Sequence, residues 1–90
     1  MSDIDNSIIT AIDESMFNLI DQFDNRLPLD LLGRVVKDVL LDKKYYIVIE
    51  NKRISPNRYI KKKYKSFSKF INLKTNFKII TENNEIFISL

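Results

Sequence analysis

The stretch that decides the fold is PNRYIKKKYKSFSKFIN, which occupies residues 56–72. An α-helix turns by about 100° per residue, so in a helix the apolar residues of this stretch share one stripe and its cations lie opposite. The apolar stripe comprises Ile60, Tyr64, Phe67 and Ile71. The cations on the opposite side are Arg58, Lys61, Lys62, Lys65 and Lys69. The pattern predicts a single amphipathic helix that packs on a core and presents positive charge outward.

Two β-rich runs follow the basic helix, at residues 77–81 and 86–89. In each run alternate residues would point to the same face, as in a strand. Between the runs, Asn83 and Asn84 suit the left-handed conformations that a tight two-residue turn demands. The sequence therefore predicts a C-terminal β-hairpin.

A further apolar run, YYIVI at residues 45–49, is aromatic and β-branched. This composition predicts a buried strand, and the obvious partner for it is the C-terminal hairpin. Residues 51–57 are predicted to be the loop that leads into the third helix. Ser55 would cap that helix, and Pro56 would occupy its first position.

Two more amphipathic helices precede this run. Apolar residues recur at helical spacing over residues 4–23 and again over residues 29–41. Pro28 separates them, because proline disfavours helical geometry at the preceding Leu27. Gly33 inside the second helix indicates a close helix crossing. With 90 residues, the chain has the length of one domain. We predict a single α+β domain, in which three helices pack on a small, mainly antiparallel sheet with a C-terminal β-hairpin.

Charge is divided between the two ends of the chain. Residues 1–30 carry seven acidic residues against Arg26 alone, whereas residues 56–78 carry eight cations and no acid. A negatively charged partner, such as a phosphate backbone, would meet the basic half. A basic protein partner, or a second copy of this chain, would meet the acidic half.

The composition argues against catalysis and metal binding. The chain has no histidine and no cysteine, which removes the usual general base, the thiolate nucleophile and the commonest zinc ligands. No pair of carboxylates is set apart for acid–base chemistry. We therefore expect no enzyme activity, no cofactor, no metal and no small-molecule substrate.

The sequence also bears on location. The longest apolar run, at residues 45–49, is far shorter than the roughly 20 residues that span a bilayer. The acidic N-terminus is unlike a signal peptide, and the lack of cysteine fits a reducing compartment. We expect an intracellular protein of the cytoplasm or nucleus. Heavy use of Lys, Asn and Ile is typical of A+T-rich genomes, such as those of parasites, viruses and phages. If the genome is viral, the expected location is the cytoplasm or nucleus of an infected host cell.

The basic helix favours nucleic-acid binding as the function. Each of the five cations on one face of this helix can neutralise one phosphate of DNA or RNA. The alternative is that a lysine-rich helix face is only a solvated surface. An anionic membrane surface is a further alternative, which we rank last because the apolar stripe is needed for the core.

Protein interaction is the competing interpretation. Phe17 and Leu41 lie off the core stripes of the first and second helices. They indicate either a wide core face or a contact with a partner. In the second case the acidic first helix would dock a basic protein or mediate self-association.

The order of elements resembles that of a winged helix-turn-helix domain. A helix, the extended pair Leu27–Pro28, two further helices and a terminal hairpin follow one another over most of the chain. The resemblance implies a nucleic-acid-binding or regulatory module in which the basic helix is the recognition helix and residues 82–85 form the wing tip. Two features differ from the family pattern. Residues 42–55 separate the second and third helices, and the wing tip carries Glu82 and Glu85 instead of cations.

Overall fold

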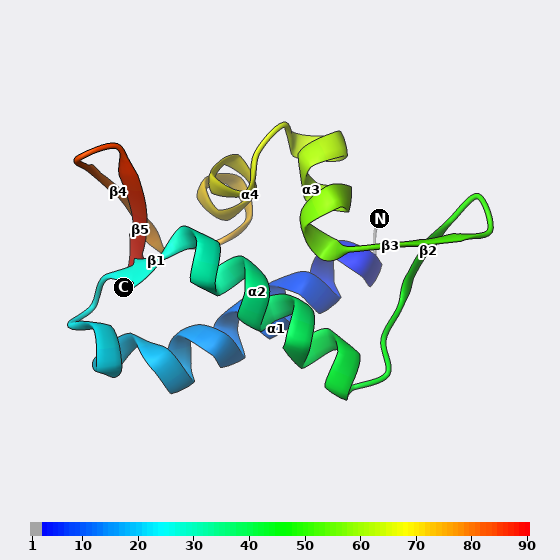
Figure 1. Cartoon of the computed structure of the whole chain (residues 1–90), viewed down its shortest axis with the longest axis horizontal. Coiled ribbons are helices and arrows are strands. Elements are labelled where there is room, and N and C mark those ends of the chain that lie inside the picture. Colours follow the sequence, from blue (N-terminus) through cyan, green and yellow to red (C-terminus); the bar gives the residue numbers. More distant parts are fainter. Residues whose placement is uncertain (1–2) are drawn as a thin grey trace.

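The computed structural model describes residues 3–90 (Figure 1). Its helices are α1 (Asp3–Leu19), continued by the short 3-10 helix η1 (Ile20–Phe23), then α2 (Leu29–Asp42), α3 (Pro56–Tyr64) and α4 (Phe67–Lys74). Its strands are β1 (Leu27–Pro28), β2 (Ile47–Ile49), β3 (Lys52–Ile54), β4 (Lys78–Glu82) and β5 (Glu85–Ser89). The predicted α+β class is confirmed, with four α-helices in the described range where three were expected.

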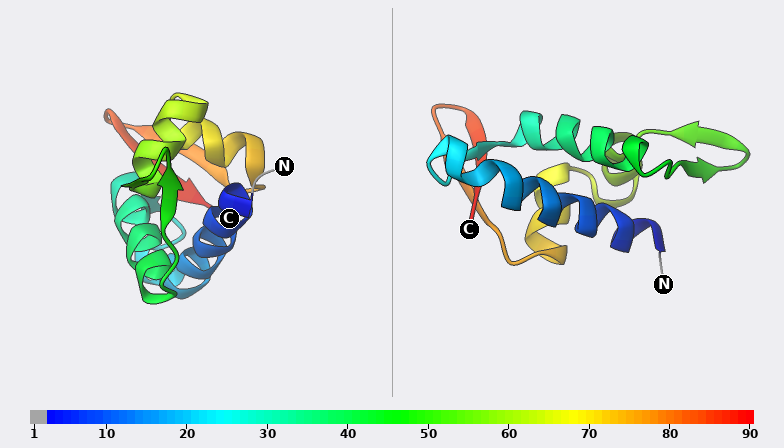
Figure 2. Two further views of the ribbon diagram at one scale, coloured as in Figure 1. Left: turned by 90° about the vertical axis from the view of Figure 1, so that its right-hand side faces the viewer. Right: turned by 90° about the horizontal axis from the view of Figure 1, so that it is seen from below.

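One hydrophobic core joins the helices to the C-terminal strands. α1 and α2 lie side by side along the long axis of the molecule (Figure 2), and α3 and α4 lie across one side of this pair (Figure 1). Each of these elements contributes a fully buried side chain, and so does β5: Ile12, Leu32, Ile60, Phe70 and Ile88. Burial of one such side chain contributes about 1.5–3 kcal/mol. The core therefore fixes where α3 and α4 sit on the α1–α2 pair.

The predicted C-terminal hairpin is confirmed. β4 and β5 pair in antiparallel fashion, and the turn between them holds Asn83 and Asn84 at φ values of 51° and 65°. β1 pairs with the other edge of β5, where Leu27 lies opposite Ile88, so the strand order is β1-β5-β4. The short extended segment before α2 is thereby joined to the end of the chain.

The predicted pairing of residues 45–49 is wrong. β2 pairs with β3 rather than with the C-terminal hairpin, and the two form a separate sheet that projects from one end of the molecule (Figure 1). Glu50 and Asn51 take positive φ values, 53° and 64°, which fold the chain tightly back on itself. Strand pairing therefore extends into residues 52–54, where the sequence pattern predicts a loop. The run is not buried throughout, since Val48 is 54% exposed.

The prediction of one continuous helix over residues 56–72 is also wrong. α3 ends at Tyr64, and Lys65 follows with a φ of 80°. Ser66 then begins α4 as its N-cap, where its Oγ accepts a hydrogen bond of 3.2 Å from the Lys69 amide. A serine that bonds to the backbone in this way competes with helix continuation. A local cap thus outweighs the periodicity of the apolar residues.

A buried carboxylate ties α1 to α3. Asp5 Oδ1 accepts a hydrogen bond of 2.6 Å from the hydroxyl of Tyr59, and Asp5 Oδ2 accepts hydrogen bonds from Tyr64 and Lys63. Burial raises the pKa of Asp5, but these hydrogen bonds outweigh that effect and hold the pKa below its usual value. The hydrogen bond to Asp5 also raises the pKa of Tyr64. The ionised carboxylate is therefore the form that the fold stabilises.

We predict that Asp5→Ala lowers the free energy of unfolding by about 1–3 kcal/mol, because it deprives the buried hydroxyl of Tyr59 of this acceptor. Urea denaturation at neutral pH measures the change. The exposed Asp13 offers a matched control, and Asp13→Ala is expected to change the free energy by less than about 0.5 kcal/mol. Equal losses in the two variants would show that the hydrogen bonds of Asp5 contribute nothing.

The contribution of Asp5 also depends on pH with a defined sign. Because its folded pKa lies below the usual value of 3.8, the stabilisation is present above that value and is lost as the pH falls through the folded pKa. Wild type and Asp5→Ala should therefore converge in stability in strong acid. Urea denaturation at a series of pH values measures the difference, and a gap that persists unchanged at low pH would contradict the assignment.

Candidate nucleic-acid interface

The start of α3 is fixed by its capping residues, as the sequence predicts. Ser55 is the N-cap, and its Oγ accepts a hydrogen bond of 3.2 Å from the Arg58 amide, while Pro56 occupies the first turn. From this start Arg58, Lys61 and Lys62 fall on the outer side of α3, where all three are exposed. The cap thus fixes the residue at which the helix begins.

The other two predicted cations lie beyond the end of α3. Lys65 is the residue that follows α3, and Lys69 lies in the first turn of α4. Both are exposed. The predicted set therefore spans two helices rather than one helical face. We call this set the basic face, and it comprises Arg58, Lys61, Lys62, Lys65 and Lys69.

Within the described residues, no ion pair neutralises the basic face. The ion pairs of residues 3–90 use other cations, in the pairs Arg26–Glu82 at 2.7 Å, Lys43–Glu14 at 2.6 Å and Lys63–Asp5 at 3.3 Å. Lys63 belongs to α3, but it lies on the side of that helix that faces α1. The cations of the basic face are thus open to solvent.

A hollow lies between α2, α3 and the start of α4, beside the basic face. We call it the crossing pocket. It has a volume of about 380 Å³, and the residues that line it include Gly33, Arg34, Asn57, Lys61, Ser66 and the acidic Asp30. Gly33 lets α2 and α3 approach closely, because a Cβ atom at this position would lie 3.0 Å from the side-chain nitrogen of Asn57. The close crossing that the glycine predicts is therefore present.

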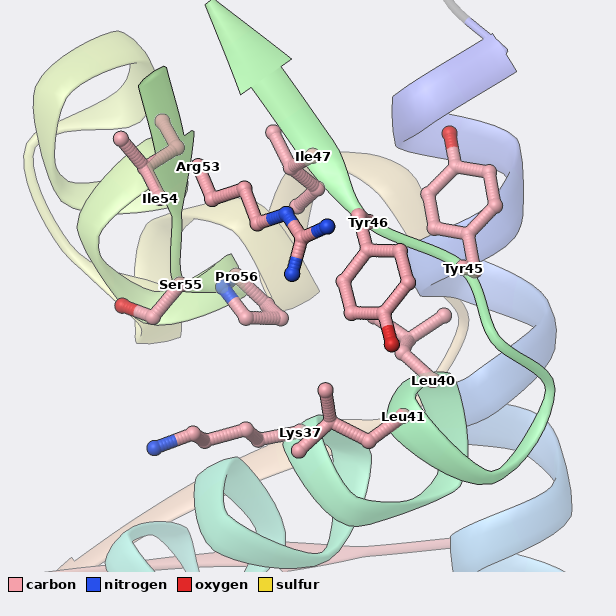
Figure 3. Close-up of a pocket in the computed structure, with 10 residues that line it drawn as sticks. All are labelled: Lys37, Leu40, Leu41, Tyr45, Tyr46, Ile47, Arg53, Ile54, Ser55 and Pro56. Carbon is pink, nitrogen blue, oxygen red and sulfur yellow. The ribbon is translucent and has the colours of Figure 1, made fainter.

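A second hollow lies under the base of the β2–β3 hairpin, against the C-terminal end of α2 (Figure 3). We call it the hairpin pocket, and its volume is about 330 Å³. Its apolar walls come from Leu40, Leu41, Ile47, Ile54 and Pro56. Its remaining lining residues are Lys37, Tyr45, Tyr46, Arg53 and Ser55. The Arg53 guanidinium carbon lies 4.2 Å from the centre of the Tyr46 ring. None of the ten lining residues is acidic.

The two pockets lie next to each other along the seam between α2 and α3. Arg34 of the crossing pocket and Lys37 of the hairpin pocket are about one turn apart on α2, and Pro56 and Asn57 are consecutive on α3. The seam extends the positive surface beyond the basic face, through cations that the sequence analysis misses. Arg34 and Lys37 share the polar side of the predicted second helix, which is a usable signal. Arg53 has no such signal, because it falls in a segment predicted as loop.

The two predicted partner-binding residues do not lie together. Phe17 is 85% exposed on α1, in a shallow hollow that it shares with Asp13, Asp21 and Leu90. Leu41 is 45% exposed at the end of α2, where it lines the hairpin pocket. The two residues therefore belong to different surfaces, and only Phe17 lies on the acidic helix.

The hairpin tip that the resemblance matches to a wing is acidic. Glu82 pairs with Arg26 at 2.7 Å, and Glu85 is exposed. A positively charged hairpin is found instead at the opposite end of the molecule, where β3 of the projecting β2–β3 pair carries Lys52 and Arg53 (Figure 1). Positive charge therefore lies with the α2–α3 seam and its adjoining hairpin, not at the C-terminal hairpin tip.

Across residues 3–90, no cluster of three or more histidine, cysteine, aspartate or glutamate side chains is placed to hold a metal ion. No helix in that range has the length and apolar character required to cross a bilayer. No family model, no curated protein and no solved structure matches the chain.

Proposed function

We propose that this protein is a non-enzymatic module that binds nucleic acid through the basic face. The observation that carries the proposal is the set of five exposed cations, on and between two adjacent helices, without a carboxylate partner in residues 3–90. Lysine and arginine side chains arranged in this way bind the phosphates of DNA or RNA and release their counterions. Other cations of residues 3–90, such as Lys44 and Lys78, also lack an ion pair, and what sets these five apart is that they gather on two adjacent helices and the connection between them.

The division of the helix favours contact with the phosphate backbone over the reading of bases. α3 has nine residues and so spans only about 13 Å. Lys65 and Lys69 lie beyond it, on the connection and on a second helix. Cations on separate elements can follow a line of phosphates, whereas base recognition needs several side chains directed from one element into a groove.

The resemblance to winged helix-turn-helix domains supports the same function. Leu27–Pro28 pairs with the C-terminal hairpin, so elements that match the family by order also share one sheet. α3 and α4 together would take the place of the recognition helix. From this resemblance we also propose a regulatory role, since such modules commonly act by binding nucleic acid.

We predict that Lys61→Glu combined with Lys62→Glu abolishes binding to labelled DNA or RNA, because two attractive charges become repulsive. Fluorescence anisotropy measures the affinity. Lys44→Glu combined with Lys78→Glu is the matched control, since it changes the net charge equally at exposed sites outside the basic face and should retain most of the affinity. If all five cations contact phosphates of duplex DNA, log K should fall with log salt concentration at a slope of roughly −4 to −5.

Two outcomes would count against this interface. Equal losses in the two pairs of variants would indicate attraction to net charge alone. An affinity that does not change with salt concentration would exclude phosphate neutralisation. Circular dichroism of each variant establishes that the fold is retained.

Phe17 favours a second function, which is protein interaction through α1. Phe17 is 85% exposed, and a partner that covered this aromatic side chain would remove apolar surface from water, which stabilises a complex. Asp13 and Asp21 share its hollow, so the complementary partner is basic. The basic face of a second copy of this chain has the required charge.

For this second function we predict that the wild-type protein self-associates and that Phe17→Ala lowers the association constant by at least about tenfold. Sedimentation equilibrium measures the constant. Val48 on β2 is 54% exposed and belongs to neither α1 nor the basic face, so Val48→Ala is the matched control and should leave self-association unchanged. A wild-type protein that stays monomeric at all concentrations would exclude self-association as the form of this interaction.

A further inference from the structure

The hairpin pocket has features that the basic face does not explain. Its inner wall is part of the core, because Leu40 and Ile47 are each only 3% exposed. It is bordered by two cations, Lys37 and Arg53, and no acidic residue lines it. An apolar hollow with a positive rim suits a ligand that combines a flat or apolar group with a negative charge.

Arg53 is directed at this hollow. Figure 3 shows its guanidinium between the Tyr46 ring and Pro56, pointing across the cavity toward Lys37 and Leu41. Stacking on Tyr46, at 4.2 Å from the ring centre, holds the guanidinium in place. No ion pair within residues 3–90 engages Arg53. Its N–H donors therefore remain available to an anion of the ligand.

We infer that the hairpin pocket binds one unpaired nucleotide of a single-stranded DNA or RNA. The base lies against the apolar wall beside the Arg53–Tyr46 stack, and the adjoining phosphate contacts Arg53 and Lys37. Every base has an aromatic face, so a site of this kind works without a particular sequence. This inference rests on the proposed function and adds to it the class of nucleic acid, which is single-stranded rather than duplex.

The position of the pocket connects it to the basic face. The crossing pocket adjoins it along the α2–α3 seam and is lined by Arg34 and Lys61, and Lys61 is a member of the basic face. A strand with one base in the hairpin pocket would therefore lead its next phosphates over the seam to the basic face. A duplex lacks this option, because its bases are stacked and paired unless one is flipped out at a cost.

The test compares binding of labelled oligo-dT, labelled oligo-U and an oligo-dA–oligo-dT duplex by fluorescence anisotropy. Tyr46→Ala should weaken binding of the single strands by roughly fivefold to a hundredfold and leave duplex binding unchanged. Tyr46→Phe retains the aromatic ring and is the matched control, which should bind like wild type. Arg53→Gln should reduce the salt slope for the single strands by about one.

A second variant guards against local unfolding of the hairpin in Tyr46→Ala. Leu41 lies on α2 at the edge of the cavity and is 45% exposed, so Leu41→Glu adds a negative charge there without disturbing the β2–β3 pair. We expect this charge to repel the phosphate and to weaken binding of the single strands. Circular dichroism and thermal unfolding report whether either variant alters the fold.

Four outcomes would contradict the nucleotide site, and each has a different meaning. Unchanged single-strand affinity in both Tyr46→Ala and Leu41→Glu, with binding still abolished by Lys61→Glu and Lys62→Glu, removes the nucleotide site and leaves the proposed function standing. Equal losses for single strands and duplex would show that the pocket does not select an unpaired base. Competition by poly-glutamate as strong as that by oligo-dT would identify an acidic protein as the occupant. A wild-type protein that binds no nucleic acid would remove the proposed function and this inference together.

Discussion

The hydrogen bonds of Asp5 set the rotation of α3, and the exposed surfaces follow from that rotation. Tyr59 and Lys63 lie about one turn apart on α3, and both reach this carboxylate on α1. Because they hold one side of the helix toward α1, Lys61 is left on the opposite side, with Arg58 beside it. The same orientation of α3 therefore brings hydrogen-bond donors to Asp5 and leaves the cations of α3 exposed to solvent.

Much of the fold is readable from the sequence because it depends on the preferences of single residues. The apolar spacing of the first two helices predicts α1 and α2 to within a few residues. Ser55 and Pro56 predict the start of α3, and Asn83 and Asn84 predict the turn between β4 and β5. The close crossing at Gly33 is likewise a local signal, since only the absence of a Cβ atom admits Asn57 there.

The errors arise where local rules compete or where distant segments meet. At Ser66 a serine cap opposes the helical spacing of its neighbours, and the cap determines the outcome. At Glu50 and Asn51 a tight turn forms without glycine, so the strand after it is not evident. The hairpin pocket needs Lys37 of α2 and Arg53 of β3 around one cavity, and only tertiary structure brings them to it. The five cations of the basic face are exposed as expected, but they lie on two helices and the connection between them rather than on one helical face.

The β2–β3 hairpin has a consequence for how the molecule fluctuates. Its two short strands pair only with each other, and an isolated two-stranded hairpin is marginally stable in water. Its attachment is at the base, where Ile47 and Ile54 meet the core. The outer part of this ribbon can therefore open and reform while Ile47 keeps its base packed in the core. A ligand in the hairpin pocket would contact the base of this hairpin. Binding would therefore reduce the fluctuations of the hairpin and leave the arrangement of the helices unchanged.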